Sequence, residues 1–225
     1  MPDVGEELVG AYLRVVQQCD FVQYNVPTRE KQGEIDVIGI NLASRTAYIC
    51  EVATHLVTGL NYVKNAKPDN VNRIGKKFKS DIKYAQTYLA EFSHHFMLWS
   101  PVIKLAPNAK RSQFGDLAQI QNEVRALYPT ISIEMVVNEV YQSCLAQLRS
   151  TASEQTDDSE FPVFRLLQIS EHLGRHVDRL QTKHGVSSSI AHIERLAAAL
   201  LASNTPGEDG VVDLDTEALP DDLSP

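Results

Sequence analysis

The stretch GEIDVIGINLASRTAYICEVATH, residues 33–55, holds two short apolar runs that each contain an acid. Residues 34–40 (EIDVIGI) alternate around Asp36, and residues 47–54 (AYICEVAT) contain Glu51. The residues between them, 43–46 (ASRT), suit a turn, so the two runs are predicted to pair as a hairpin. Because adjacent strands lie only about 5 Å apart, the two carboxylates are expected to converge on one point.

Periodic patterns predict the elements around this hairpin. Asp3 and Glu6 form a capping-box pattern ahead of a helical apolar repeat, which predicts a helix at residues 4–18. Further helices are predicted at 71–91, 112–128 and 138–149, and further strands at 20–27, 95–103 and 131–137. This order indicates an α/β fold with a mixed central sheet flanked by helices.

Charge divides the chain near residue 150. Residues 1–150 carry 16 Lys and Arg against 15 Asp and Glu, whereas residues 151–225 carry 5 against 14. We therefore expect a core domain at 1–150, a linker at 151–160, a hairpin of two amphipathic helices at 161–203, and a disordered acidic tail at 204–225.

Composition also restricts the cellular setting. No apolar run approaches the roughly 18 residues of a membrane span, and the N-terminus lacks the pattern of a signal peptide. The three cysteines, Cys19, Cys50 and Cys144, are widely spaced in apolar surroundings, which favours reduced core cysteines over a zinc site or disulfides. These features predict a cytoplasmic protein without a membrane partner.

Paired carboxylates on neighbouring strands suit a divalent cation. Hard oxygen ligands favour Mg²⁺, which takes one or two carboxylates together with waters and substrate phosphates. Such a cation polarises a scissile phosphate and lowers the pKa of an attacking water. A lysine nearby would hold or deprotonate that water and stabilise the developing charge.

The first 90 residues resemble the PD-(D/E)XK nuclease superfamily, especially its restriction-endonuclease-like and resolvase-like branches. The resemblance rests on a leading helix with a Glu, on GEIDVIG at 33–39, and on an apolar strand that ends in Glu51-Val52. It implies a restriction-endonuclease-like core in which Asp36 and Glu51 are metal ligands. Glu7 would correspond to the acid of the first helix, although an ordinary surface Glu is the alternative.

The chain departs from the family pattern at Ala53, where the family has its lysine. Members of the superfamily are known to carry this lysine on the following helix, and Lys77 lies there, beside the apolar arc of residues 71–91. Lys76 and Lys79 are weaker candidates, because they point away from that arc. The alternative is that Lys77 lies at a helix boundary and pairs with Asp81 four residues later.

Two further residues of this region carry open interpretations. Glu34 alternates with Asp36, so it would point to the same side and could support the metal ligands. His55 would share the strand face of Glu51 if the strand extends that far, and it could bind a softer metal such as Mn²⁺ or act as a base. The alternative for His55 is a hydrogen-bonded structural residue.

Residues 64–83 hold seven basic residues against two acidic ones. This segment is either a solvated helix face or a basic patch for phosphates. As a nucleic-acid contact it would use Lys64, Lys67, Arg73, Lys76, Lys79 and Lys83.

The sequence thus predicts a metal-dependent nuclease that hydrolyses DNA with Mg²⁺ or Mn²⁺. The alternative is a catalytically degenerate nuclease fold that only binds nucleic acid or protein, which Ala53 and the acidic tail favour. A third hypothesis is that the helices of residues 161–203 form a homodimer, since nuclease cores that cut both strands often pair.

Overall fold

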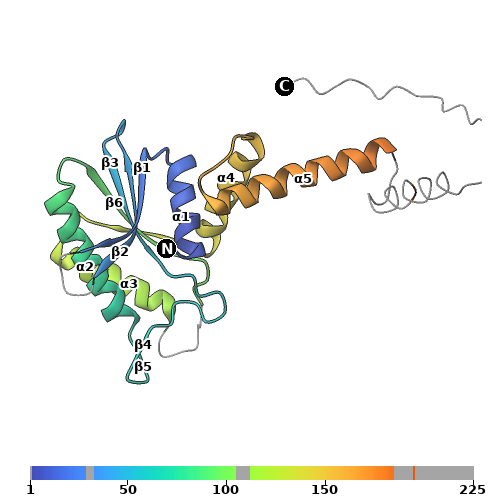
Figure 1. The fold of residues 1–225 in the computed structure, drawn as a ribbon. Coiled ribbons are helices and arrows are strands. Elements are labelled where there is room, and N and C mark those ends of the chain that lie inside the picture. The colour runs from blue at the N-terminus through green and yellow to red at the C-terminus, as the bar shows by residue number, and fades with distance from the viewer. Residues whose placement is uncertain (1, 29–32, 105–111, 185–194, 196–225) are drawn as a thin grey trace, which may run out of the picture. The chain divides into compact units, whose positions relative to one another are not determined.

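A five-stranded mixed sheet lies at the centre of the computed structural model, which describes residues 2–28, 33–104, 112–184 and 195. The strands are β1 (Phe21–Pro27), β2 (Glu34–Asn41), β3 (Thr46–Val52), β6 (Ser93–Ser100) and β7 (Ile133–Val137), in the order β1-β2-β3-β6-β7. Neighbours among β1, β2 and β3 are antiparallel, whereas β6 runs parallel to β3 and to β7. The predicted α/β class with a mixed sheet is confirmed (Figure 1).

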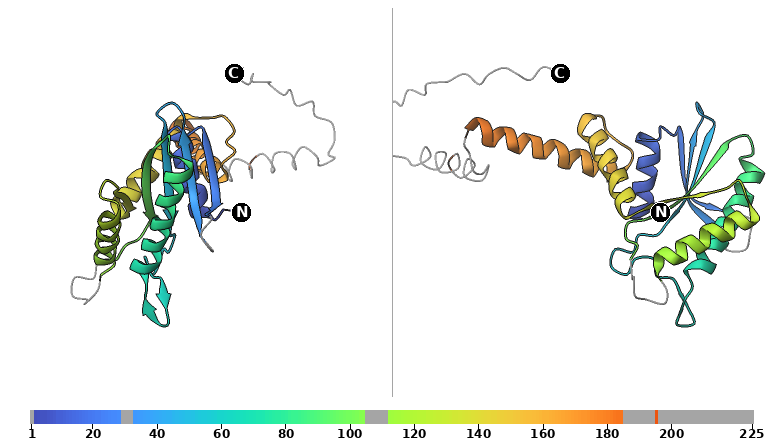
Figure 2. Two further views of the ribbon diagram at one scale, coloured as in Figure 1. Left: turned by 90° about the vertical axis from the view of Figure 1, so that its left-hand side faces the viewer. Right: turned by 180° about the vertical axis from the view of Figure 1, so that it is seen from behind.

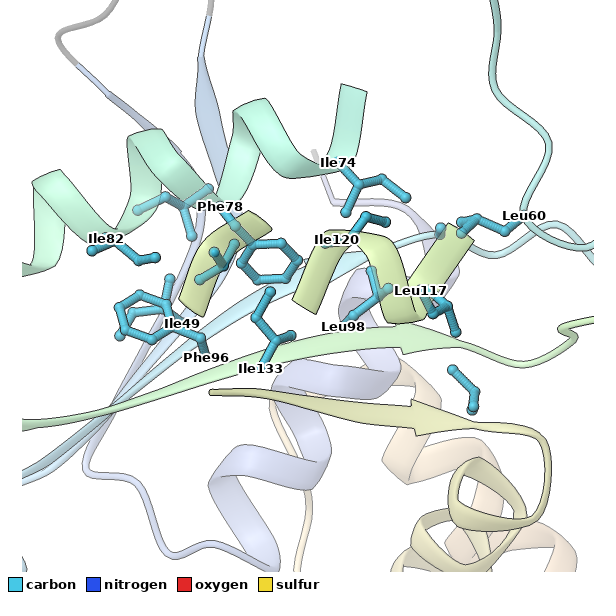
Figure 3. Close-up of a cluster of buried hydrophobic side chains, with 14 of the residues drawn as sticks. Ile49, Leu60, Ile74, Phe78, Ile82, Phe96, Leu98, Leu117, Ile120 and Ile133 are labelled. Atoms are coloured by element: carbon cyan, nitrogen blue, oxygen red, sulfur yellow. The ribbon is translucent and has the colours of Figure 1, made fainter. Parts of the chain in front are cut away.

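Helices cover both faces of the sheet. Helices α1 (Val4–Val15) and α4 (Asn138–Glu154) pack on one face, and α2 (Asn70–Tyr88) and α3 (Gln113–Leu127) pack on the other (Figure 1). Figure 3 shows Phe78 and Ile82 of α2 among side chains of the sheet such as Phe96. This packing places the inner side of α2 directly over the sheet.

The double cover explains the composition of β2 and β3. Strands buried on both faces are nearly continuous apolar runs. In β2, five of the six residues from Ile35 to Ile40 are apolar or glycine. Asp36 is the exception, and it is buried with the rest. A buried carboxylate in such a strand requires compensation, because desolvating a charge is costly.

A two-stranded ribbon between β3 and α2 is the element that the sequence did not indicate. Strands β4 (Val63–Lys64) and β5 (Lys67–Pro68) pair antiparallel and form a second, separate sheet. In Figures 1 and 2 this ribbon projects beyond the N-terminal end of α2. It has only two residues on each side, too few for a recognisable strand alternation.

The C-terminal part differs from the expected boundaries. Helix α4 continues through Glu154 instead of ending before a linker at 151. Phe161 and Phe164, at the beginning of α5 (Pro162–His184), pack with Ala11 of α1 and Leu148 of α4. The first compact unit therefore extends beyond residue 150, to Arg175.

The second unit comprises residues 176–225, of which the structure describes the end of α5 and Arg195. The second helix of the expected hairpin and the acidic tail at 204–225 lie outside the described residues. Cys19, Cys50 and Cys144 are buried free thiols, as predicted. Among the described residues, no helix is long and apolar enough to span a membrane.

Candidate active site

The hairpin register brings the two strand acids together. Val37 pairs with Cys50 across β2 and β3, so the preceding residue, Asp36, lies opposite the following one, Glu51. Both carboxyl groups are buried, with exposed fractions of 6% and 3%. The convergence expected from the sequence is therefore present on the sheet face that α2 covers.

Lys77 of α2 reaches both carboxylates. Its Nζ donates to Oδ1 of Asp36 at 2.8 Å and forms an ion pair with Oε2 of Glu51. The second oxygen of Asp36 accepts the backbone N–H of Val52 at 2.8 Å. The amine of α2 therefore bridges two carboxylates from neighbouring strands.

Ala53 carries no amine and lies in the core. It is 4% exposed, packs against the apolar residues under α2, and donates its N–H to the carbonyl oxygen of Trp99. That Lys77 serves in place of a lysine at residue 53 stays a prediction; the structure shows the contact of Lys77 with both acids.

Asp81 is a third acid of the site that the sequence did not assign to it. It lies one turn after Lys77 on α2, is 1% exposed, and is in hydrogen-bond contact with the carboxyl of Glu51. Neither Oε1 of Glu51 nor Oδ2 of Asp81 receives a hydrogen bond from a described donor. Two ionised carboxylates in contact repel each other. Either a proton shared between them or a bound cation would remove this repulsion and satisfy the two oxygens.

Burial and mutual repulsion control the protonation of this group. Burial raises the pKa of Asp81 to about 7, while its hydrogen bond to Glu51 and the charge of Lys77 act against that shift. Burial, followed by the charges of Asp81 and Asp36, raises the pKa of Glu51 well above its ordinary value. Three carboxyl groups thus face one amine in a poorly hydrated space.

Lys77 carries a positive charge in this setting. Burial alone would lower the pKa of its amine, but the carboxylates of Glu51 and Asp36 outweigh burial and raise the pKa above its ordinary value. The Lys77 side chain as a whole is 30% exposed, and its ammonium group is paired with the two acids. A permanently charged amine is suited to hold an anion or a water and unsuited to act as a base.

The first turn of α1 carries two neighbouring acids, Glu6 and Glu7. Glu7 lines a hollow of about 200 Å³ with Arg14, Tyr24 and Glu160, on the α1 side of the molecule. The carboxylate of the neighbouring Glu6 accepts the backbone N–H of Asp3 at 3.0 Å instead. Helical geometry separates adjacent residues by about 100°, so the two acids point in different directions.

Gly5 brings this end of α1 close to the end of β3. A Cβ atom on Gly5 would collide with the side chain of Thr54. Glu6 accepts a hydrogen bond from the Asn25 side chain at 3.4 Å and completes the capping box with Asp3. Burial, the largest influence, raises the pKa of Glu6, and the charge of Asp36 acts in the same direction.

His55 and Glu34 lie at the margins of the site. Strand β3 ends at Val52, so the alternation that would align His55 with Glu51 does not extend to it. His55 is exposed, and its ring packs edge-on against Tyr62 at 5.7 Å between centroids. Glu34 begins β2 as an exposed residue.

The basic residues between 64 and 83 fall into two groups. Lys64, Lys67, Arg73 and Lys76 are exposed, and the guanidinium of Arg73 lies 4.5 Å above the ring of Tyr62. Lys79 is half-buried and pairs with Glu123 of α3 at 3.3 Å, which makes it a helix-to-helix contact. Lys83 is exposed one turn beyond Lys79 on α2.

No protein-family model matches this chain, and neither a curated protein nor a solved structure matches it. Among the described residues, no group of three or more His, Cys, Asp or Glu side chains is arranged to hold a metal ion. The case for a function therefore depends on the residues of the site.

Proposed function

We propose that this chain is a metal-dependent nuclease that hydrolyses DNA phosphodiester bonds, with a restriction-endonuclease-like arrangement of its site. The observation that carries the proposal is the contact of the Lys77 amine with both Asp36 and Glu51. It unites two strand carboxylates and one amine, although the strand position that would carry the amine is Ala53.

Asp36 and Glu51 offer the oxygen donors that a hard divalent cation such as Mg²⁺ or Mn²⁺ prefers. Oε1 of Glu51 is buried and receives no hydrogen bond from a described donor. Mg²⁺ needs only one or two carboxylates and completes its shell with water and phosphate. Asp36 and Glu51 would hold the cation, which when bound polarises the phosphate and lowers the pKa of a water.

The chain's own groups would position the substrate and stabilise charge. The N–H of Val52 fixes Asp36, so its carboxylate is oriented before any ligand arrives. The Lys77 side chain is 30% exposed, and its ammonium would donate to a phosphate oxygen on which negative charge develops. Its raised pKa favours this role over removal of a proton from water.

Exposed basic residues next to the site would bind the DNA backbone. Lys64, Lys67, Arg73 and Lys76 lie on the ribbon and on the first turns of α2, which lead to Lys77. Lysine and arginine contacts to phosphates orient a duplex without reading its sequence. Lys79 would take part only after giving up its ion pair with Glu123.

A second candidate is a degenerate nuclease fold that binds without cutting. The same ion pairs favour it, because Lys77 neutralises part of the carboxylate charge without a metal. In this role a proton shared between the buried Glu51 and Asp81 would take the place of a cation, and the acids would contribute to stability alone.

Cleavage of supercoiled plasmid in Mg²⁺ or Mn²⁺ separates the two candidates. We expect Lys77→Ala and Asp36→Ala to lower the rate by about 10²–10³-fold, as loss of one charge-stabilising donor does elsewhere. Lys79→Ala is the matched control, because it removes a lysine of the same helix that pairs away from the site.

The double variant Ala53→Lys/Lys77→Ala returns the amine to the strand position. We expect it to recover part of the activity lost in Lys77→Ala, because residue 53 lies two positions after Glu51 and packs in the core beneath α2. Cutting that persists in Asp36→Ala would assign the activity to a contaminant and favour the binding module.

A further inference from the structure

The β4–β5 ribbon is built as a rigid projection that the hydrolytic site does not explain. Its base is fixed by buried Asn70, which accepts the Tyr62 N–H at 2.7 Å and donates to the Leu60 carbonyl at 2.9 Å and to Asp116 at 2.7 Å. The carbonyl of Tyr62 also accepts the N–H of Asp69 at 2.7 Å. The two ends of the ribbon are therefore tied to each other, to α2 and to α3.

The tip of the ribbon concentrates positive charge that the fold does not require. Lys64 and Lys67 are directly opposed across the strands, and both are exposed. Like charges at directly opposed positions destabilise a strand pair. Residues 61–68 (NYVKNAKP) contain no acid, and neither lysine forms an ion pair with a described residue. Such an arrangement suits contact with a polyanion.

The turn at the tip exposes side chains in an unfavourable backbone conformation. Asn65 and Ala66 have φ values of 50° and 59°, as a two-residue hairpin turn with both residues left-handed requires. Alanine in this region costs about 1–2 kcal/mol, whereas glycine would relieve the strain. Below the tip, Val63 is 54% exposed and opposes Pro68. The ribbon thus presents an amide, two cations and an apolar side chain to solvent.

The base of the ribbon lies about one major-groove width from Lys77 along the axis of α2. Asp69 precedes α2, and Lys77 lies eight residues later, which corresponds to about 12 Å along the helix axis. The major groove of B-form DNA is also about 12 Å wide and admits a two-stranded ribbon. Arg73 lies between them, stacked on Tyr62, and can contact the intervening backbone. A phosphate at Lys77 would therefore lie at the edge of a groove that the ribbon can enter.

We propose that the β4–β5 ribbon enters the major groove of duplex DNA beside the phosphate bound at Lys77, an inference that rests on the proposed function for the location of that phosphate. Lys64 and Lys67 contact the backbone on either side of the groove. Asn65 reaches base edges, where an asparagine amide pairs with adenine, and Val63 supplies an apolar surface for the methyl group of thymine. Double-stranded RNA is a poor partner, because its major groove is deep and narrow.

Binding of the full-length protein to fluorescent duplexes in EDTA tests the ribbon without cleavage. Lys64→Ala/Lys67→Ala is expected to weaken binding to a DNA duplex by about 10–100-fold and to reduce the salt dependence, the slope of log K against log salt concentration, by about 2. Lys64→Arg/Lys67→Arg keeps the charges and should restore both properties. Arg45→Ala/Arg125→Ala is the matched control, because both arginines are exposed and lie outside the ribbon.

Three probes of one sequence, namely a DNA duplex, an RNA duplex and a DNA single strand, identify the partner. We expect the DNA duplex to bind most tightly, and Asn65→Ala to reduce the preference among duplex sequences while leaving the salt dependence unchanged. The inference is overturned if the ribbon and control variants lose affinity equally, or if RNA or single strands bind as tightly as the DNA duplex.

Cleavage in Mg²⁺ distinguishes this inference from the proposed function. Ribbon-dependent duplex binding by a protein that cuts nothing would support the ribbon inference and overturn the hydrolytic proposal. Normal cutting of duplex DNA by Lys64→Ala/Lys67→Ala, with unchanged affinity, would overturn the ribbon inference and leave the hydrolytic proposal standing.

Discussion

Replacement of Asp81 by Asn should stabilise the metal-free protein above neutral pH. The Asp81 carboxyl is buried against Glu51, and burial raises its pKa from 3.8 to about 7. Asparagine has nearly the same shape, can donate to Glu51, and never becomes charged. The substitution therefore removes the repulsion between the two acids without creating a cavity.

The size of the stability gain follows from the shift in the pKa of Asp81. An increase of about three pKa units, at about 1.36 kcal/mol each, sets a ceiling of about 4 kcal/mol on the cost of ionising Asp81 in the folded state. Part of this cost is shared with Glu51, whose pKa is also raised. We expect Asp81→Asn to gain about 2–4 kcal/mol at pH 8, or roughly 5–15 °C in Tm for a chain of this size.

The pH dependence has a defined sign. Between pH 4 and pH 7 the unfolded chain releases the Asp81 proton while the folded chain retains it, so the stability of the wild type falls as the pH rises. The advantage of Asp81→Asn should therefore be absent near pH 4, grow through this window, and be complete above pH 7. Thermal unfolding in EDTA, followed by circular dichroism across this range, measures it.

Glu139→Gln is the control for this experiment, because it removes an exposed carboxylate from the first turn of α4. Its effect should remain within about 0.5 kcal/mol at every pH. Addition of Mn²⁺ should reduce the advantage of Asp81→Asn, since a cation held by Asp36 and Glu51 offsets the same negative charge. An Asp81→Asn protein that is less stable than wild type at pH 8, or equally favoured at pH 4, would refute the reasoning.

Three other outcomes follow from the structure. Lys77→Ala should lower the metal-free stability at pH 8 by about 3 kcal/mol in urea unfolding, because it leaves the buried carboxylates without their ammonium partner. Lys79→Ala is the control: its pair with Glu123 is more exposed, so its loss should cost less than about 1 kcal/mol. Mn²⁺ should raise the Tm of the wild type but leave that of Asp36→Asn unchanged; an equal rise in both would place the cation elsewhere. Leu173 is 58% exposed on α5, so Leu173→Lys should convert a dimer into a monomer in sedimentation if α5 pairs two copies, whereas an unchanged mass would remove that role.

The sequence by itself determined the elements and the pair of acids. Short apolar runs, of which residues 34–40 alternate, located all five strands of the main sheet, helical periods located α1 to α5, and the hairpin of residues 33–55 was sufficient to predict that Asp36 and Glu51 meet. These features are local: alternation and a short turn fix register within about twenty residues. The one departure at this level is the ribbon of residues 63–68, whose strands are too short to carry a pattern.

Only the tertiary structure decided which side chains join the two acids. Lys77 lies 41 positions after Asp36, so its contact depends on how α2 packs across the sheet, and Asp81 becomes a buried partner of Glu51 through the same packing. The position of Asp81 beside the apolar arc of α2 was visible in the sequence, but its burial was not. Likewise, the seating of α1 on its neighbours places Glu7 at a hollow that it lines with Arg14 and Glu160. Periodicity defines the apolar face of a helix, whereas the residues at the edge of that face are assigned only when the helix is seated on its neighbours.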